Sequence, residues 1–373
     1  MTTTVSDLAA ESAPGTTGRA PAGRRRRLAL AGLAAWILGM VLVPWVVSSD
    51  LWMGVGVFAL IAAIGTLGLQ VIMGFTGQIS MGHAAFMAIG AYSSAWLGVE
   101  KEQPFWIWLP ASALVAGLAG ALFAPAAVRI RGLYLAVATL GLVFIGTYVW
   151  ETWTDVSGGD AGRLAAPVII NDQDILNGYW SGDTQVLTLF QAWWYFALAV
   201  LLLVALLTWN IKRSRLGRAM MAVRDRDLAA GVVGIPVTRT KVIAFAISSA
   251  FAGVSGALLT AYMGYFTPGQ WGLMLSVDII AMVVIGGLGT ISGAILGAFF
   301  VKVIPEVISW LSQYLPFISQ DAKVDGGVTA PLLSQFVYGL VIVLVLIFEP
   351  RGLSQLCRKP FTLLSSRRKG VGR

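Results

Sequence analysis

Residues 51–92 read "LWMGVGVFALIAAIGTLGLQVIMGFTGQISMGHAAFMAIGAY", and this stretch decides the class of fold. Residues 51–73 are almost entirely apolar and long enough to cross about 30 Å of hydrocarbon. A second apolar segment follows the polar, glycine-rich stretch that begins at Gly74. The pattern predicts two membrane-spanning helices joined by a connection that a simple membrane anchor would not need.

The same alternation of apolar runs and short polar connections continues through the chain. The composition is 57% hydrophobic and only 12% charged over 373 residues, far below the charge of a soluble domain. We therefore predict an all-α polytopic membrane protein with about ten transmembrane helices. The expected spans are residues 28–47, 51–73, 79–98, 105–128, 132–150, 187–209, 242–263, 275–289, 293–312 and 332–348. The eighth and ninth spans could instead form one broken or re-entrant element.

The distribution of charge predicts the orientation, because Lys and Arg accumulate on the cytoplasmic side of membrane proteins. Basic residues cluster at 24–27, at Arg129 and Arg131, and in the basic loop, residues 210–241, which holds eight Lys or Arg. The loop 151–186 has six acids and one Arg. We expect this acidic loop to lie outside the cell.

Both termini are then expected in the cytoplasm. Residues 1–27 are predicted to be a disordered basic tail, residues 28–350 the transmembrane domain, and residues 351–373 a second basic tail. A cleaved signal peptide is disfavoured because the first apolar run is too long for one.

Several function classes lack the residues that they require. The single cysteine, Cys357, excludes an intrachain disulfide, and no lysine follows a glycine, so no P-loop can hold nucleotide phosphate. The predicted spans offer no nucleophile paired with a base, so intramembrane catalysis is not expected. The net charge is +8, and the Lys and Arg residues that carry it lie beside apolar segments, where they set the orientation of the spans in the membrane. We therefore expect no binding of nucleic acid.

A glycine motif occurs twice. Gly74-x-x-Gly77-x-Ile79-Ser80 has a second copy, Gly286-x-x-Gly289-x-Ile291-Ser292, and both precede a predicted span that runs outward. Internal repeats with glycine-interrupted helices point toward a transport path. Stripes of small residues in other spans, such as Ser249, Gly253 and Ala257, favour close helix packing.

Two polar side chains near the first copy are candidates for the path. His83 is either a hydrogen-bonded packing residue or a path residue, and the sequence places no acid near it for a proton relay. Gln78 either faces water at the membrane edge or takes part in function. Lys302, in the ninth span, is expected to extend toward an interface.

The basic loop contains "RLGRAMMAVRDRDLAAGVVG", residues 215–234, which predicts an amphipathic helix with Ser214 as its N-cap. Leu216, Met220, Val223 and Leu228 form its apolar stripe. The helix either lies on the anionic leaflet or docks in a groove of a cytoplasmic partner. Asp225 and Asp227 favour the partner, because acids weaken binding to anionic lipid.

Taken in order, several segments resemble the membrane permeases of ABC importers for branched-chain amino acids, in particular the larger permease of the pair. The segments are "GFTGQISMGHAAFMAIGAY", "RIRGLYLAVATLGLVFI", "SGGDAG", the stretch from Arg213 to Leu259, and "MVVIGGLGTISGAILGA". The resemblance covers residues 51–353 and implies a type II-importer-like permease bundle in the bacterial cell membrane.

The resemblance also implies partners. They are a second homologous permease subunit, two cytoplasmic ATPase subunits and an extracytoplasmic substrate-binding protein. The chain itself would bind no cofactor, and ATP and Mg would be bound by the ATPase subunits. The cargo would be a branched-chain amino acid, or urea, another amide or a small carboxylate.

Specific residues match the motifs of that family. Those matching its ATPase-coupling segment are Gly217, Arg218, Arg224, Asp225, Asp227, Ala229, Ala230 and Gly231. Those expected at the translocation path or the permease interface are Gly74, Gly77, Gln78, Ser80, His83, Gly286, Gly287, Gly289 and Ser292. Arg129, Arg131, Gly132 and Tyr134 match a third segment with a structural or coupling role. The main alternative is an ion-coupled secondary transporter or channel, which normally has buried acids that these spans largely lack.

Overall fold

The computed structural model describes residues 22–47, 49–130, 132–170, 173–181, 184–312 and 352–356, with isolated positions between 336 and 347. The chain divides into two compact units, residues 1–48 and 49–373. In the first unit, α1 spans Ala22–Val46 and contains Pro44. The remaining elements belong to the second unit.

Helices occupy the predicted spans from residue 51 to residue 312. They are α2 (Asp50–Leu69), α3 (His83–Ala95), α4 (Phe105–Arg129), α5 (Leu133–Thr152), α7 (Leu189–Arg213), α10 (Val237–Met263), α11 (Leu273–Gly286) and α12 (Ile291–Ser312). Within the described residues, six helices are long and apolar enough to cross a membrane, namely α2 with its extension, α4, α5, α7, α10 and α12. The tenth predicted span, 332–348, lies outside the described residues except for isolated positions, so the count of ten stays a prediction.

Two helices end in wider turns. A π-helical turn, Gln70–Phe75, continues α2, and another, Trp96–Glu100, continues α3. π-Helical turns are rare and occur frequently at functional sites. The first of them contains Gly74, so the repeated glycine motif begins inside a distorted end of α2.

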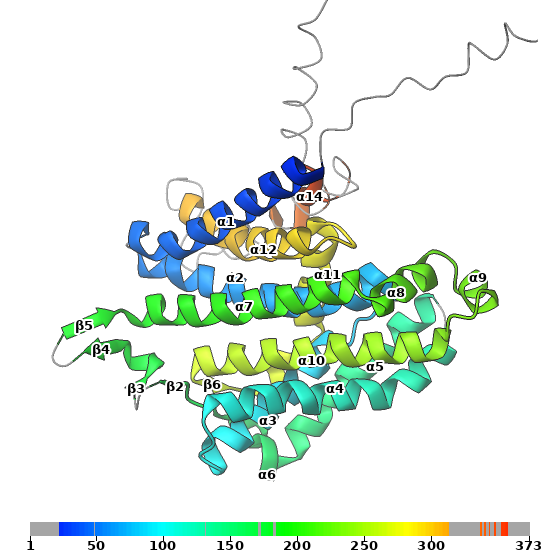
Figure 1. Ribbon diagram of the computed structural model, residues 1–373. Helices are drawn as coiled ribbons and strands as arrows, with labels where there is room; N and C mark the ends of the chain where they lie inside the picture. Colours follow the sequence, from blue (N-terminus) through cyan, green and yellow to red (C-terminus); the bar gives the residue numbers. More distant parts are fainter. Residues whose placement is uncertain are drawn as a thin grey trace, which may run out of the picture. The chain divides into compact units, whose positions relative to one another are not determined.

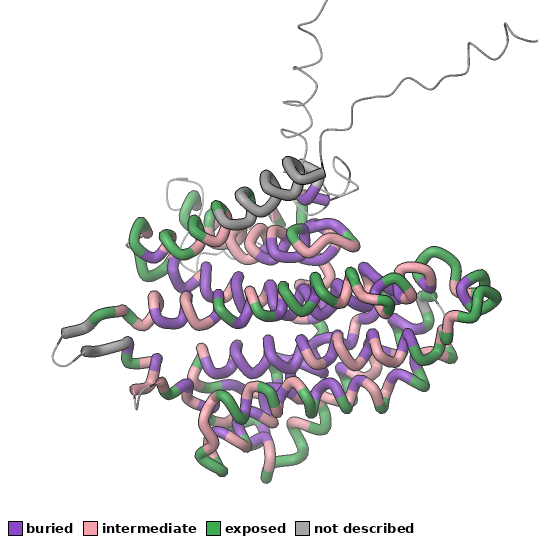
Figure 2. The backbone as a smooth tube through the Cα atoms, in the orientation of Figure 1, coloured by how far each residue is buried: buried purple, intermediate pink, exposed green. Residues whose placement is uncertain are grey.

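Small residues allow the central helices to approach closely. A Cβ on Gly256 of α10 would overlap the carbonyl oxygen of Met87 in α3, and a Cβ on Gly253 would overlap Ala116 of α4. Figure 2 shows the resulting buried interior, which runs through α2 and α10. The predicted stripe that includes Gly253 therefore packs helices together, as small residues do in membranes.

Short elements lie at the two ends of the helices (Figure 1). At one end are two helices of the basic loop, α8 (Arg215–Asp225) and α9 (Asp227–Val232). At the other end are α6 (Thr154–Ser157) and antiparallel pairs of short strands, which the sequence did not predict. The pairs are β1 (Arg163–Leu164) with β6 (Tyr265–Phe266), β2 (Ile169–Ile170) with β3 (Gln173–Asp174), and β4 (Tyr179–Ser181) with β5 (Thr184–Leu187). A further short helix, α14, spans Leu353–Leu356.

The acidic loop is folded onto the helices. Arg163 is largely buried, and its guanidinium lies 2.7 Å from the Glu100 carboxylate and also donates to the Val156 carbonyl. The pairing of Leu164 with Tyr265 joins the same loop to the end of α10. The only arginine of this loop therefore fixes it in place.

Candidate functional site: the junction of two glycine loops

The two copies of the glycine motif form similar turns at the end of the molecule that carries α8 and α9. We call residues 74–81 the first glycine loop and residues 286–290 the second glycine loop. Each follows the end of a helix, and the second glycine of each motif has a left-handed φ, +70° at Gly77 and +82° at Gly289. An L side chain is strained in this conformation, so glycine is the residue that suits both turns.

The two glycine loops touch. A Cβ on Gly74 would lie only 2.8 Å from the backbone nitrogen of Gly289. Beside this contact the buried amide of Gln70 donates from Nε2 to the carbonyls of Gly287 (3.1 Å) and Thr290 (3.0 Å). The first loop, through the end of α2, is thus hydrogen bonded to the second.

The basic loop contains two short helices where the sequence predicted one. Arg226, between α8 and α9, has an extended backbone (φ −157°, ψ 105°), which interrupts the helix. Ser214 caps α8 as predicted, since its Oγ accepts from the backbone nitrogen of Gly217 at 3.2 Å. Gly217 is buried at the corner between α7 and α8, where a Cβ would overlap the Ile211 carbonyl.

The predicted apolar stripe of the basic loop mostly faces the protein. Met220 and Val223 are buried with 0% and 4% exposure. Leu228 is 71% exposed, and Val232 and Val233 at the end of α9 are 89% and 81% exposed. The free apolar surface is therefore the tip around α9, which Figure 2 shows as exposed, and not the length of α8.

Two cations connect this region to the glycine loops. Arg224 Nη1 donates to the Gly74 carbonyl at 2.7 Å, and Lys212 Nζ donates to the Gly289 carbonyl at 2.6 Å. Charge-assisted hydrogen bonds are among the stronger ones in proteins. These bonds join α8 to the first glycine loop and the end of α7 to the second.

A half-buried ion pair ties α9 to α10. Lys241 is 8% exposed, and its Nζ lies 3.5 Å from Asp227 Oδ2. Breaking a buried pair by removing one partner leaves an uncompensated charge. Asp227 therefore holds α9 against the start of α10.

The other predicted coupling residues differ in their surroundings. Arg218 is exposed and donates to the Arg213 carbonyl at 2.9 Å. Asp225, Ala229 and Gly231 are exposed, whereas Ala230 is buried. The eight predicted residues thus separate into an outward group and a group that fixes the basic loop to the helices.

A cavity of about 630 Å³ lies between the first glycine loop, the corner joining α4 to α5, and the residues around Arg226. Gln78 lines it and is 8% exposed, and among the described residues its Oε1 has no hydrogen-bond partner. Gln78 is therefore turned into this cavity and away from the outer surface, and its part in the path stays a prediction.

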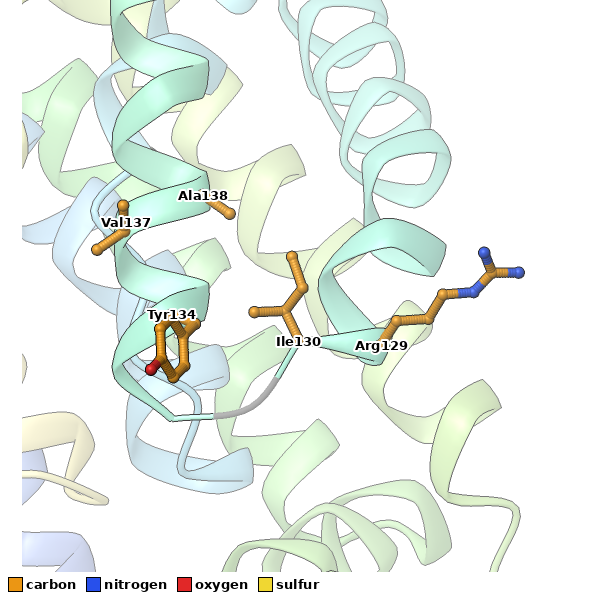
Figure 3. Close-up of a pocket in the computed structure, with 5 residues that line it drawn as sticks. All are labelled: Arg129, Ile130, Tyr134, Val137 and Ala138. Carbon is orange, nitrogen blue, oxygen red and sulfur yellow. The ribbon is translucent and has the colours of Figure 1, made fainter.

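A second cavity, of about 780 Å³, opens at the same corner. Figure 3 shows Ile130 of the corner and Val137 and Ala138 of α5 beside it, while the side chain of Arg129 points away. Tyr134 also lines this space and is 79% exposed. Arg131, predicted here as well, lies outside the described residues.

The remaining predicted path residues do not join the contact between the loops. His83 is buried against α2, where a Cβ on Gly68 would lie 3.2 Å from its Cε1, and its Nε2 has no partner among the described residues. Ser80 is buried and Ser292 is exposed. Gly286 packs against the Gly293 carbonyl, inside the hairpin of α11 and α12.

Sequence reasoning missed three residues of the junction, Gln70, Lys212 and Lys241. Gln70 carried a usable signal, because it is a polar side chain within an otherwise apolar predicted span. The two lysines carried none, since cations at the ends of spans are usual. Their partners lie far away in sequence and become visible only in the fold.

Residues 51–346 match the family model described as the branched-chain amino acid transport system / permease component. The chain belongs to this family. It is a multi-pass bacterial membrane protein, and the family resemblance expected from the sequence is confirmed. The members are transport permeases rather than enzymes.

Individual relatives agree. The chain is 31% identical over 323 residues to the high-affinity branched-chain amino acid transport system permease protein LivM of Salmonella typhimurium, covering 82% of this chain and 70% of LivM. It is 28% identical to the autoinducer 2 import system permease protein LsrC of an Enterobacter species, covering 81% of this chain and 71% of LsrC. It is 27% identical to LivH of Salmonella typhimurium, covering 69% of this chain and 82% of LivH. No solved structure matches the chain.

Proposed function

We propose that this permease is one half of the membrane path of an ATP-driven importer for branched-chain amino acids. The second half is a homologous permease, two cytoplasmic ATPase subunits bind ATP and Mg, and an extracytoplasmic binding protein delivers the solute. Similarity to both LivM and LivH supports a pair of permeases. The greater identity to LivM than to LsrC supports an amino acid as the cargo.

The tip of the basic loop is the proposed docking surface for an ATPase subunit. Because Met220 and Val223 already pack against the protein, α8 has little apolar surface left to insert into a leaflet. The tip around α9 carries three exposed apolar side chains, those of Leu228, Val232 and Val233. An exposed apolar tip with flanking charges suits binding in a groove on a soluble partner. This argument favours docking over the alternative of a helix lying on the membrane.

The single observation that carries the proposal is the pair of bonds from Arg224 and Lys212 to the two glycine loops. When ATP binding draws the ATPase subunits together, the basic loop moves with them and the glycine carbonyls follow. A partner shifts an equilibrium only by its difference in affinity for the two states. The bonds to the loops would make the open and closed states of the path differ at the docking surface.

The test uses the complete complex reconstituted in vesicles, with uptake of labelled leucine and ATP hydrolysis measured together. Arg224→Ala should lower the leucine taken up per ATP hydrolysed, because movement of α8 no longer reaches Gly74. The control is Arg213→Ala, which removes a cation whose guanidinium lies 3.7 Å from the ring centre of Trp209 on its own helix. An unchanged ratio in the Arg224 variant would contradict the coupling role, and uphill uptake by this chain alone would contradict the importer itself.

A further inference from the structure

The hairpin of α11 and α12 carries charges that the coupling mechanism does not use. Lys302 of α12, which the sequence predicted to extend toward an interface, has its Nζ 3.7 Å from Asp278 Oδ2 of α11. Glu306, four residues after Lys302 on α12, was overlooked in the sequence and adds a second carboxylate on the same side of that helix.

The ion pair lies about halfway along α12. Lys302 follows Ile291, the first residue of α12, by eleven positions, which places it about 16 Å along the helix. The two helices are antiparallel neighbours joined by a short turn, and a Cβ on Gly297 would overlap the Met282 carbonyl. Asp278, one turn before Met282 in α11, therefore lies at the same depth as Lys302.

The pair is open on one side. The side chains of Lys302 and Asp278 are 31% and 28% exposed, and Met274 and Val277 beside Asp278 are 75% and 42% exposed. Charges within a membrane face a water-filled cavity or the interior of a bundle, because contact with lipid tails is costly. From the cost of placing these charges against lipid tails, we infer that this face is turned toward the path and not toward lipid.

We propose that Asp278 and Lys302 form a binding site for the charged head group of a zwitterionic α-amino acid on its way through the membrane. This rests on the function proposed above. The ammonium and carboxylate of such a solute are separated by one carbon, so they can reach two opposite charges that lie side by side. Asp278 binds the ammonium and Lys302 the carboxylate, while the aliphatic side chain lies against Met274 and Val277.

Exchange of partners explains why a matched pair suits a transport path. Each protein charge leaves the other only as a solute charge takes its place, so no charge is left uncompensated in a medium of low dielectric constant. When the solute departs, the internal pair forms again. A single charge would instead hold a counter-ion or retain the solute.

The experiment uses the reconstituted complex with its second permease, ATPase subunits and binding protein. Asp278→Leu/Lys302→Met removes both charges at similar volume, so neither is left alone. We expect the complex to assemble and hydrolyse ATP, while labelled leucine taken up per ATP falls at least about tenfold, roughly the value of one charge-assisted bond. Reversal, Asp278→Lys/Lys302→Asp, should restore much of the uptake, because a zwitterion can bind turned around.

Two controls accompany these variants. Leu311→Ala, near the end of α12, and Leu122→Ala, in α4, change exposed apolar side chains outside the proposed site, and both should transport nearly as the wild type does. Uptake by the double-neutral variant equal to that of the wild type would overturn the site. Loss of the second permease from the purified double variant would overturn it too, since the face would then be a subunit contact. Failure of the wild-type complex to take up any branched-chain amino acid would instead refute the proposed function.

Discussion

Replacement of Gln70 tests whether its hydrogen bonds between the two glycine loops matter for transport rather than for the stability of the fold. The Gln70 side chain is fully buried. Its hydrogen bonds to the Gly287 and Thr290 carbonyls are the only side-chain hydrogen bonds that the described residues show between the π-helical turn after α2 and the second glycine loop. The orientation of the amide is fixed, because both partners are acceptors and only Nε2 can donate. Gln70→Met has similar length and removes both bonds.

The expected change in the free energy of unfolding is small. Loss of two neutral hydrogen bonds costs about 2 kcal/mol, whereas removal of the buried Oε1, which has no partner among the described residues, recovers about 1 to 3 kcal/mol. The two carbonyls are not orphaned, since that of Gly287 also accepts from Thr290 Oγ1 at 2.9 Å and that of Thr290 from the Ala294 nitrogen at 3.2 Å. The melting temperature should therefore change by at most about 2 °C.

Gln70→Glu is the opposing variant. In this variant a carboxylate oxygen replaces Nε2 beside the Gly287 and Thr290 carbonyl oxygens, and a charge is buried without a partner. The free energy of unfolding should fall by about 3 kcal/mol or more. The assay is thermal unfolding of the purified complex followed by size-exclusion chromatography, with uptake per ATP measured in vesicles. We expect the Met variant to stay folded but to transport poorly, and the Glu variant to unfold early. Equal melting temperatures for the two variants would refute the reasoning.

Two further predictions concern helix packing and docking. Gly256→Ala should reduce the yield of folded protein, because the added methyl group forces α10 away from the Met87 carbonyl at a cost of about 1 to 3 kcal/mol. Gly141→Ala in α5 should be tolerated, because a Cβ there meets open space. The yield of folded protein after size-exclusion chromatography measures both effects. Leu228→Asp should leave the permease folded but abolish its co-purification with the ATPase subunit, because it places a charge on the exposed tip; co-purification from this variant at the wild-type level would contradict the docking surface.

The positions of the long helices could be predicted because each depends on a local property, the length of an apolar run. Residues 105–128 were predicted for α4, which spans Phe105–Arg129, and residues 242–263 for α10, which begins five residues earlier at Val237. The early start of α10 includes Lys241, a charge that a hydropathy pattern excludes. Its burial against Asp227 is a tertiary effect that overrides the local signal.

The candidate site was predicted in its parts but not in its assembly. The two glycine motifs could be found as a repeat, and their similar left-handed turns follow from glycine itself. Their mutual contact and the bonds from Arg224 and Lys212 could not be found, because those partners are 77 to 150 residues apart. The apolar residues of the basic loop were identified from the sequence. Their spacing predicted one face of one helix, whereas Met220 and Val223 face inward on α8 and Leu228 faces out on α9.

One helix reaches from the strand end of the protein to the basic loop. α10 has 27 residues, about 40 Å, and is bound at its start to Asp227 through Lys241 and followed after its end by β6, which pairs with β1 of the acidic loop. A protein that binds to the strands and favours one position of α10 would change the affinity of a second protein for the basic loop. That second protein would change the affinity of the first by the same factor. For the proposed importer, delivery of solute at the strand end and binding of ATP at the basic loop would then be coupled through α10.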